Sequence, residues 1–400
     1  MLRTINYEPK KVNPLNAYFE SSLYIQDSSK FNQIVKRTNP MHTGYFHDLQ
    51  FTVPKGNKFR IIALGGSSTY GFGLPNPYYD PYIYNFTQLM AQHCPHITFE
   101  AINAGGIGHG SYRVAIINKE IVNYEPDLLL FYIGHNEFWE YPIYQEINYR
   151  SPFLYFLSRH FSKWHTYTFL RDLVIDINKA TINVPAAFEG EYRIFNQTMY
   201  NDVKVKFRQN ILAIMKLIKE RNIPVIFSTL PANLKVNPEM KTDWLWDASH
   251  HLKKLSDTET KAWEMNYKKG VDQIKSGSYR TALVSLNKCK KIDSTYAKLY
   301  YYIGKCYEKL GDTTFARINY WKHIDHSRRL IVSEFNEIIR EVCLLHQIPF
   351  IDTQEKFETL SNNLTDYQLF IDSMHPNANG HKIIANEFFE AFKKTYSIED

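Results

Sequence analysis

The chain has 400 residues, and its 47 Lys and Arg against 41 Asp and Glu give a formal net charge of +6. A hydrophobic fraction of 44% with 22% charged residues is ordinary for a folded protein and excludes a disordered chain, while the small charge excess excludes a dedicated nucleic-acid binder. Four scattered cysteines without a CxxC pair exclude a disulfide scaffold and a cysteine-based zinc site.

Residues 1–58 are polar and interrupted by prolines, so we expect an extended N-terminal lead without regular elements. The start of the chain has no apolar stretch of the 7–15 residues that a signal peptide needs. The longest apolar run, at 128–133, is far shorter than the roughly 20 residues of a membrane-spanning helix. The sequence therefore predicts a cytoplasmic chain without a membrane span.

From residue 59 onward, short apolar runs typical of buried strands alternate with helix-length amphipathic segments. Strands are expected at 59–64, 98–102, 127–133, 224–229 and 347–351, and helices at 79–92, 112–123 and 203–221. This alternation predicts an α/β domain whose parallel sheet is covered by helices on both faces. We expect its first part at 59–250 and its last part at 331–400.

The stretch between the fourth and fifth strands contains an internal repeat. Four pairs of residues are each 34 positions apart: Tyr267 and Tyr301, Gly270 and Gly304, Gly277 and Gly311, Ala282 and Ala316. A 34-residue period with small residues at fixed helix positions resembles the tetratricopeptide repeat and predicts an all-α insert at 251–330. Two repeats are too few for a free solenoid, so the insert should pack against the main domain. An ordinary helical hairpin is the alternative.

Reactive side chains follow the predicted strands. Ser67 comes after the first strand, a glycine cluster at 105–110 after the second, Asn136 after the third, and Asp372 and His375 near the C-terminus. The carboxyl ends of parallel strands meet at one edge of a sheet, so these groups should gather there. A serine, glycine N–H groups, an amide and an Asp-x-x-His pair are what acyl transfer requires.

Each residue of this set has an expected role. A neighbouring imidazole must take the proton of Ser67, and His375, oriented by Asp372, is the candidate. The backbone N–H groups of Ser67 and Gly108 and the side-chain amide of Asn136 would stabilise the oxyanion. More ordinary roles remain open, because Ser67 and Asp372 also suit helix caps, Asn136 suits a turn, and a neighbouring glycine could replace Gly108.

The ordered set of Gly-x-Ser, a glycine block, Gly-x-Asn and a terminal Asp-x-x-His resembles the SGNH (GDSL-type) hydrolase family over roughly 59–140 and 331–390. The resemblance implies a flavodoxin-like three-layer α/β/α sandwich with Ser67 as nucleophile, Gly108 and Asn136 as oxyanion residues, His375 as base and Asp372 as its partner. With the tetratricopeptide-like insert, the chain looks like a bacterial subgroup that combines both modules. It departs from the family at Gly66 and Glu137, where an Asp is usual.

The sequence thus predicts a serine esterase acting through an acyl-serine intermediate on a small-molecule or glycan ester, with O-acetyl groups on a carbohydrate among the candidates. No cofactor and no metal are expected: His93, Cys94 and His96 are close together but lack a fourth ligand. The alternatives are a carbohydrate O-acyltransferase and a non-catalytic interaction protein that uses its helical repeats. The insert is also expected to be the surface for any protein partner, and no nucleic-acid partner is expected.

Overall fold

The computed structural model describes residues 22–30, 33–141, 197–239, 251–327 and 333–396. The chain divides into two compact units, one formed by Met1–Pro54 with Tyr141–Ile194 and the other by Lys55–Glu140 with Phe195–Asp400. The first 21 residues of the predicted lead, and the predicted boundaries at 250 and 330, lie outside the described residues.

The described part of the first unit is a small antiparallel sheet. It consists of β1 (Tyr24–Lys30), β2 (Gln33–Thr38) and β3 (Gln50–Val53), paired in that order, with a short 3₁₀ helix at Pro40–His42. The rings of Tyr24 and Phe51 meet edge to face at 4.9 Å between centroids, and both are buried. These strands are not among the elements expected from the sequence, which had assigned no regular structure to this stretch.

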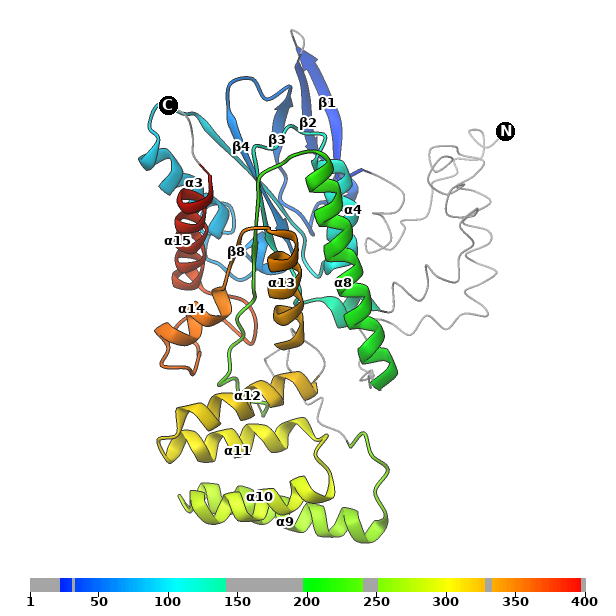
Figure 1. Cartoon of the computed structure of the whole chain (residues 1–400), viewed down its shortest axis with the longest axis vertical. Coiled ribbons are helices and arrows are strands. Elements are labelled where there is room, and N and C mark those ends of the chain that lie inside the picture. Colours follow the sequence, from blue (N-terminus) through cyan, green and yellow to red (C-terminus); the bar gives the residue numbers. More distant parts are fainter. Residues whose placement is uncertain (1–21, 31–32, 142–196, 240–250, 328–332, 397–400) are drawn as a thin grey trace, which may run out of the picture. The chain divides into compact units, whose positions relative to one another are not determined.

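The second unit is built on a five-stranded parallel sheet (Figure 1). Its strands are β4 (Phe59–Gly65), β5 (Phe99–Gly105), β6 (Leu128–Tyr132), β7 (Val225–Ser228) and β8 (Phe350–Ile351), in the spatial order β5-β4-β6-β7-β8. Numbered along the chain, this is the 2-1-3-4-5 order of a doubly wound sheet. All five residues of β6, the central strand, are buried. The predicted α/β fold with a parallel sheet is therefore confirmed.

Helices cover both faces of this sheet (Figure 1). On one face α3 (Tyr82–His93) packs against α15 (Ala378–Thr395), and on the other α8 (Gln197–Glu220) packs against α4 (Ser111–Ile121) and α13 (Ser333–His346). Two short helices of the described chain follow strands of this sheet, α2 (Ser67–Tyr70) directly after β4 and α14 (Thr353–Leu360) directly after β8.

In the described chain, five helices lie between β7 and β8, and the four that precede α13 form two pairs. The first pair is α9 (Asp257–Lys275) and α10 (Tyr279–Ile292), and the second is α11 (Ala297–Lys309) and α12 (Thr313–Ser327). Residues 34 apart hold matching places: a Cβ on Gly270 would meet Leu286 of α10, and one on Gly304 would meet Tyr320 of α12. Glycine thus lets the helices of each pair approach closely.

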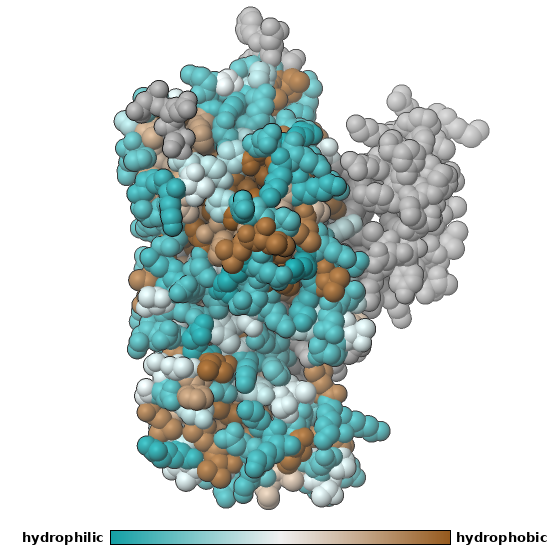
Figure 2. Space-filling model, in the orientation of Figure 1, coloured by the Kyte–Doolittle hydropathy of each residue, from teal (hydrophilic) through white to brown (hydrophobic). Residues whose placement is uncertain are grey.

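Hydrophilic residues cover most of the molecular face drawn in Figure 2, and hydrophobic residues occur there in small groups. Among the large apolar side chains that remain exposed are Leu344 and Leu345 in the last turn of α13. No helix in the described part of the chain is long and apolar enough to cross a lipid bilayer.

Candidate functional site

The structure brings the predicted reactive residues to one edge of the sheet. Ser67 is the first residue of α2 after β4, Gly108 lies in the loop after β5, and Asn136 follows β6. Because β5, β4 and β6 are adjacent and parallel, these three segments meet at their carboxyl ends. The turn with Asp372 and His375, which precedes α15, reaches the same edge.

Ser67, His375 and Asp372 form a continuous hydrogen-bonded chain. The Ser67 Oγ lies 2.8 Å from His375 Nε2, and His375 Nδ1 lies 2.6 Å from Asp372 Oδ2. The carboxylate favours the tautomer with its proton on Nδ1, which leaves Nε2 free to accept the serine proton. Ser67 and His375 are 7% and 4% exposed, so little water competes for these bonds. The groups have the geometry of a nucleophile, a base and an orienting carboxylate.

Asp372 shapes the turn as well as orienting the ring. Its Oδ1 accepts hydrogen bonds from the backbone N–H groups of Met374, at 2.9 Å, and His375, at 2.8 Å. Burial alone would raise the pKa of Asp372, but its hydrogen bonds and the charge of His375 outweigh burial and hold the pKa below its usual value. The carboxylate therefore stays ionised at neutral pH.

Asn233 holds this turn from behind and was not found by sequence reasoning. It is fully buried after β7, where its side-chain amide donates to the Asp372 carbonyl at 3.1 Å and its backbone N–H donates to the Ser373 carbonyl at 3.0 Å. Its position could have indicated a role at this site, since Asn233 is a polar residue that follows a strand of the parallel sheet at the same edge as Ser67.

The loop after β5 is packed against Asn136. Gly108 has a φ of +72°, a conformation that favours glycine, and the Asn136 side-chain amide donates to the His109 carbonyl at 3.0 Å. A Cβ on Gly66 would lie 2.6 Å from the Asn136 Nδ2. The absence of a side chain at Gly66, a departure from the family pattern, thus makes room for the amide of Asn136.

Two glutamates beyond Asn136 cap the helix that follows this loop. Glu137, the second departure from the family pattern, accepts from the Ser111 N–H at 2.8 Å and from its hydroxyl at 2.6 Å. Glu140 pairs with Arg113, whose Nε lies 2.6 Å from Oε1. Arg113 and Glu140 were not among the predicted site residues. The sequence gives little indication of their role, since a charged residue near the start of a helix usually faces solvent.

Two further histidines near His375 are held neutral. Burial, reinforced by the charge of His375, lowers the pKa of His135 to about 4 and that of His381 to about 3. The His381 Nδ1 accepts the backbone N–H of Tyr82 at 3.1 Å, and the His135 Nε2 lies 3.4 Å from the Pro231 carbonyl. His375 is the imidazole that contacts Ser67.

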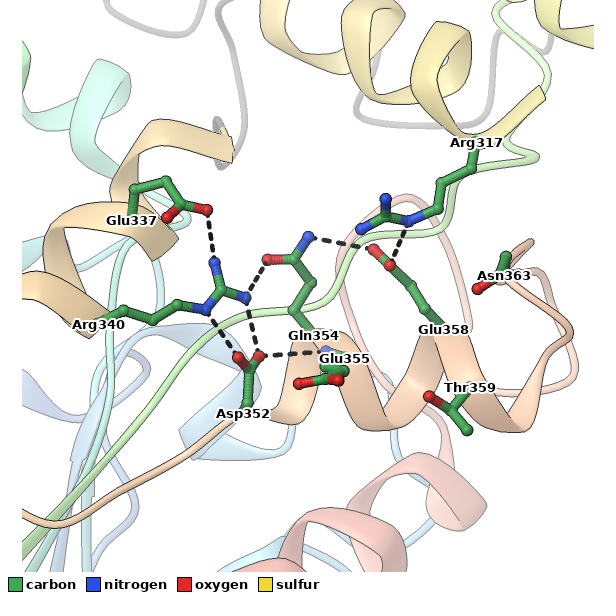
Figure 3. Close-up of a pocket in the computed structure, with 9 residues that line it drawn as sticks. All are labelled: Arg317, Glu337, Arg340, Asp352, Gln354, Glu355, Glu358, Thr359 and Asn363. Carbon is green, nitrogen blue, oxygen red and sulfur yellow. Dashed lines mark hydrogen bonds and ion pairs between the residues drawn. The ribbon is translucent and has the colours of Figure 1, made fainter. Parts of the chain in front are cut away.

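A polar cavity of about 440 Å³ lies away from these groups, where α12, α13 and α14 meet (Figure 3). Its wall includes Arg317, Arg340, Asp352, Gln354 and Glu358, and neither Ser67 nor His375 lines it. The Arg340 guanidinium donates to Asp352 and Gln354, and the Glu358 carboxylate accepts from Arg317 and Gln354. Because these polar groups satisfy one another, the cavity is a structural junction between the insert and the sheet domain.

Within the described ranges, no three His, Cys, Asp or Glu side chains converge as a metal site would require. His93 instead packs edge to face on Phe389 at 5.5 Å between ring centroids.

Comparison with known proteins gives a family match. The model of the GDSL-like lipase/acylhydrolase family matches residues 63–383, whereas no curated protein matches the chain. The solved structures that are similar to it include the following three. A GDSL-like lipase from Bacteroides thetaiotaomicron is 13% identical, with a TM-score of 0.37 over 84% of this chain and 89% of that one. The acetylxylan esterase Axe2 from Geobacillus stearothermophilus is 12% identical, with a TM-score of 0.40 over 86% and 96%. A lipolytic G-D-S-L family member from Veillonella parvula is 10% identical, with a TM-score of 0.37 over 84% and 98%.

Proposed function

The chain belongs to the GDSL-like lipase/acylhydrolase family, and we propose that it is a serine esterase that cleaves acyl esters through an acyl-serine intermediate on Ser67. The observation that carries this proposal is the hydrogen-bonded chain from Ser67 Oγ to His375 Nε2 and from His375 Nδ1 to Asp372. A serine hydroxyl is a poor nucleophile at neutral pH, and an oriented imidazole at 2.8 Å removes that obstacle.

In the first half-reaction, the Ser67 Oγ attacks the ester carbonyl carbon while its proton moves to the His375 Nε2. The new oxyanion accepts hydrogen bonds from the N–H groups of Ser67 and Gly108 and from the Asn136 amide. The tetrahedral intermediate then collapses, and the Nε2 proton passes to the leaving alcohol. Asp372 stabilises the imidazolium throughout and keeps its own charge.

In the second half-reaction, water takes the place of the alcohol. His375 accepts a proton from this water, which attacks the acyl-serine carbonyl, and the Ser67 hydroxyl reforms as the acid leaves. A carbohydrate hydroxyl in place of water would give acyl transfer by the same steps, so O-acyltransfer is the alternative reaction. Each oxyanion donor typically contributes a factor of about 10²–10³ to the rate.

For the substrate we propose a small-molecule or glycan ester, with O-acetyl groups on a carbohydrate as the leading candidate. The Phe72 ring supports this choice, because its centroid lies 5.0 Å from that of the His375 imidazole. The leaving alcohol receives its proton from this imidazole, so an aromatic ring beside it is suited to contact the apolar face of a departing sugar.

We also propose that α9–α12 are tetratricopeptide-like repeats inserted into a hydrolase domain, with the domain limits at 59–250, 251–330 and 331–400. The matched places of Gly270 and Gly304, and the positive φ of Gly277 and Gly311 between paired helices, support a repeated unit. Residues 251–327 carry 15 Lys and Arg against 8 Asp and Glu, a net charge of +7. This charge favours an acidic partner or substrate at the insert.

A fluorophosphonate probe tests the proposal directly, because it labels serines that are activated as nucleophiles. We expect wild-type protein to be labelled and Ser67→Ala not to be. Ser68→Ala is the matched control, because Ser68 lies one residue away and is 3% exposed against 7% for Ser67. The Ser68 hydroxyl has no hydrogen-bond partner in the described chain, so labelling should persist. Unlabelled wild-type protein would favour the non-catalytic interaction protein.

Kinetics on nitrophenyl esters and acetylated sugars test the base. Replacing His375 by Ala should lower kcat at least about 10³-fold, since the acting groups work as a unit. Acetylated sugars should be cleaved faster than long-chain esters if the substrate proposal holds. Hydrolysis that survives His375→Ala unchanged would overturn the assignment of the base.

A further inference from the structure

The loop after β5, which carries the proposed oxyanion residue Gly108, is held in place by contacts to its backbone carbonyl groups. Three consecutive carbonyls each lie at a side-chain nitrogen: Ile107 O is 2.9 Å from the His109 Nδ1, Gly108 O accepts from the Arg113 Nη2, and His109 O accepts from the Asn136 Nδ2 at 3.0 Å. In a trans peptide the carbonyl and the N–H point in opposite directions. The Ile107 carbonyl shares a peptide plane with the Gly108 N–H, and the Gly108 carbonyl lies in the next plane along the chain. Fixing both carbonyls fixes the backbone on the two sides of Gly108, and with it the direction of the Gly108 N–H.

Arg113 is the least replaceable of these donors, because it joins the loop to a buried carboxylate. Its Nη2 binds the Gly108 carbonyl while its Nε lies 2.6 Å from the Glu140 Oε1. The side chains of Arg113 and Glu140 are 2% and 0% exposed. A guanidinium presents several N–H groups in a rigid planar fork, so both contacts are made from one fixed plane.

Glu140 in turn fixes the helix on which Arg113 stands. Its carboxylate accepts the backbone N–H of Tyr112 at 3.1 Å, and Glu137 accepts that of Ser111 at 2.8 Å. The residue before the helix, Gly110, has no side chain to cap these groups, and a Cβ there would lie 2.6 Å from the Glu140 Oε2. The start of α4 is thus docked directly on the segment that follows β6.

That segment also carries Asn136. The two proposed oxyanion donors, the Gly108 N–H and the Asn136 amide, come from different loops, and their separation must suit one small oxygen atom. Glu140 lies four residues after Asn136 and Arg113 five residues after Gly108, so the ion pair connects the two loops close to both donors.

We propose that Arg113 and Glu140 are a positioning pair that sets the Gly108 N–H against the Asn136 amide in the oxyanion site. This inference rests on the proposed esterase function and adds two residues to its machinery. Neither side chain touches the substrate, and both act through the loop. A buried ion pair adds little net stability compared with apolar residues of similar size, so its geometric effect is separable from its effect on folding.

Arg113→Lys tests the pair while a positive charge remains beside Glu140. A lysine ammonium is a single point charge and does not reproduce the planar fork that reaches both Glu140 and the Gly108 carbonyl. With nitrophenyl acetate we expect kcat to fall about 10–100-fold while KM stays within about twofold, because a displaced oxyanion donor weakens the transition state more than the bound substrate.

An inhibitor supplies a second readout that a merely structural role would leave unmoved. Phenylboronic acid binds a serine hydroxyl as a tetrahedral anion, so its inhibition constant should rise in parallel with the fall in kcat. The matched control is Arg208→Lys, because Arg208 makes a two-pronged contact with Glu341 at 2.8 and 2.6 Å on the surface between α8 and α13. Its kinetics and inhibition should equal those of wild type.

A paired substitution keeps the test valid if Arg113→Lys does not fold. Arg113→Met combined with Glu140→Met removes both charges and retains the volume, and it should fold but remain slow. Unchanged kcat and boronate inhibition in either folded variant would overturn the positioning role. Wild-type protein that neither hydrolyses esters nor reacts with the fluorophosphonate probe would instead refute the esterase proposal, and the positioning role with it.

Discussion

The pKa of the buried Glu137 carboxyl depends strongly on the groups around it. Burial raises its pKa to about 8, and the charge of Glu140 adds to this rise, while the hydrogen bonds from Ser111 and the charge of Arg113 act in the opposite direction. Glu137 therefore retains its proton in the folded chain at pH values at which the unfolded chain has lost it.

Stability should consequently depend on pH through Glu137. Between its unfolded pKa of about 4.3 and the folded value of about 8, only the folded state binds this proton, so the free energy of unfolding falls as pH rises, by at most about 1.4 kcal/mol per pH unit. Urea unfolding of wild type and Glu137→Gln at pH 5, 6, 7 and 8 measures this contribution. The Gln variant should show a shallower decline, and parallel curves would contradict the prediction.

At the residue scale, sequence reasoning identified the residues that belong to a motif. It missed the residues whose role depends on a contact with a distant segment. Ser67, Asp372 and His375 stand in recognisable local patterns, and the structure brings them into hydrogen-bonding distance. Asn233 acts on Asp372 across 139 positions, and the pairing of Arg113 with Glu140 depends on two loops meeting. Such roles follow from packing between segments, which no local pattern encodes.

At the scale of elements, the apolar runs predicted the buried sheet well. The structure has a strand within each of the five predicted segments or overlapping it, because strands buried on both faces are nearly continuous in hydrophobic residues. The three N-terminal strands were missed for the converse reason. β1 and β2 have the sequences YIQDSSK and QIVKRT, in which polar residues interrupt the apolar ones and leave no apolar run to detect.

The junction between α12 and α14 yields a prediction about elements. The Glu358 carboxylate, 5% exposed, accepts from the Trp321 Nε1 at 2.8 Å and from the Arg317 Nε at 2.5 Å. Removing the indole N–H by Trp321→Phe should lower the free energy of unfolding by about 1.5–3 kcal/mol, as is typical of hydrogen bonds to charged groups.

Trp263→Phe is the matched control for this bond. Trp263 on α9 is similarly buried, at 3% exposed, but its Nε1 has no hydrogen-bond partner in the described chain. Both variants lose the same ring volume, so the difference between their urea unfolding curves isolates the bond to Glu358. An equal loss of stability in both would show that the bond adds nothing to the junction.

At the scale of the whole molecule, charge is concentrated in the insert. Residues 251–327 carry +7 while the entire chain carries +6, so the remainder is close to neutral. We expect replacement of residues 255–325 by a short Gly/Ser linker to leave kcat/KM on nitrophenyl acetate nearly unchanged and to weaken action on large acidic substrates. The positive charge of the insert attracts acidic substrates over a long range, which supports this expectation. Added salt screens this attraction, so the difference between the two chains should shrink as the salt concentration rises.

The deletion also removes Trp321 and Arg317 from Glu358, so it should be combined with Glu358→Gln to avoid a buried unpaired charge. The Glu358→Gln variant of the full chain is then the control. Equal kinetics of the deleted and full-length chains on large acidic substrates, at low and at high salt, would rule out a role for the insert in choosing them.

The hydroxyl of Ser67 and the His375 imidazole to which it is hydrogen-bonded are 308 positions apart along the polypeptide. At a synthesis rate of about 5–20 residues per second, a ribosome would finish the serine about 15–60 s before the histidine. Under the proposed function, a nascent chain that stops before His375 would thus carry a serine hydroxyl without its base, however well its early strands had assembled. Esterase activity would then begin only after residue 375 has been synthesised and folded into place, so shorter nascent chains would leave esters intact.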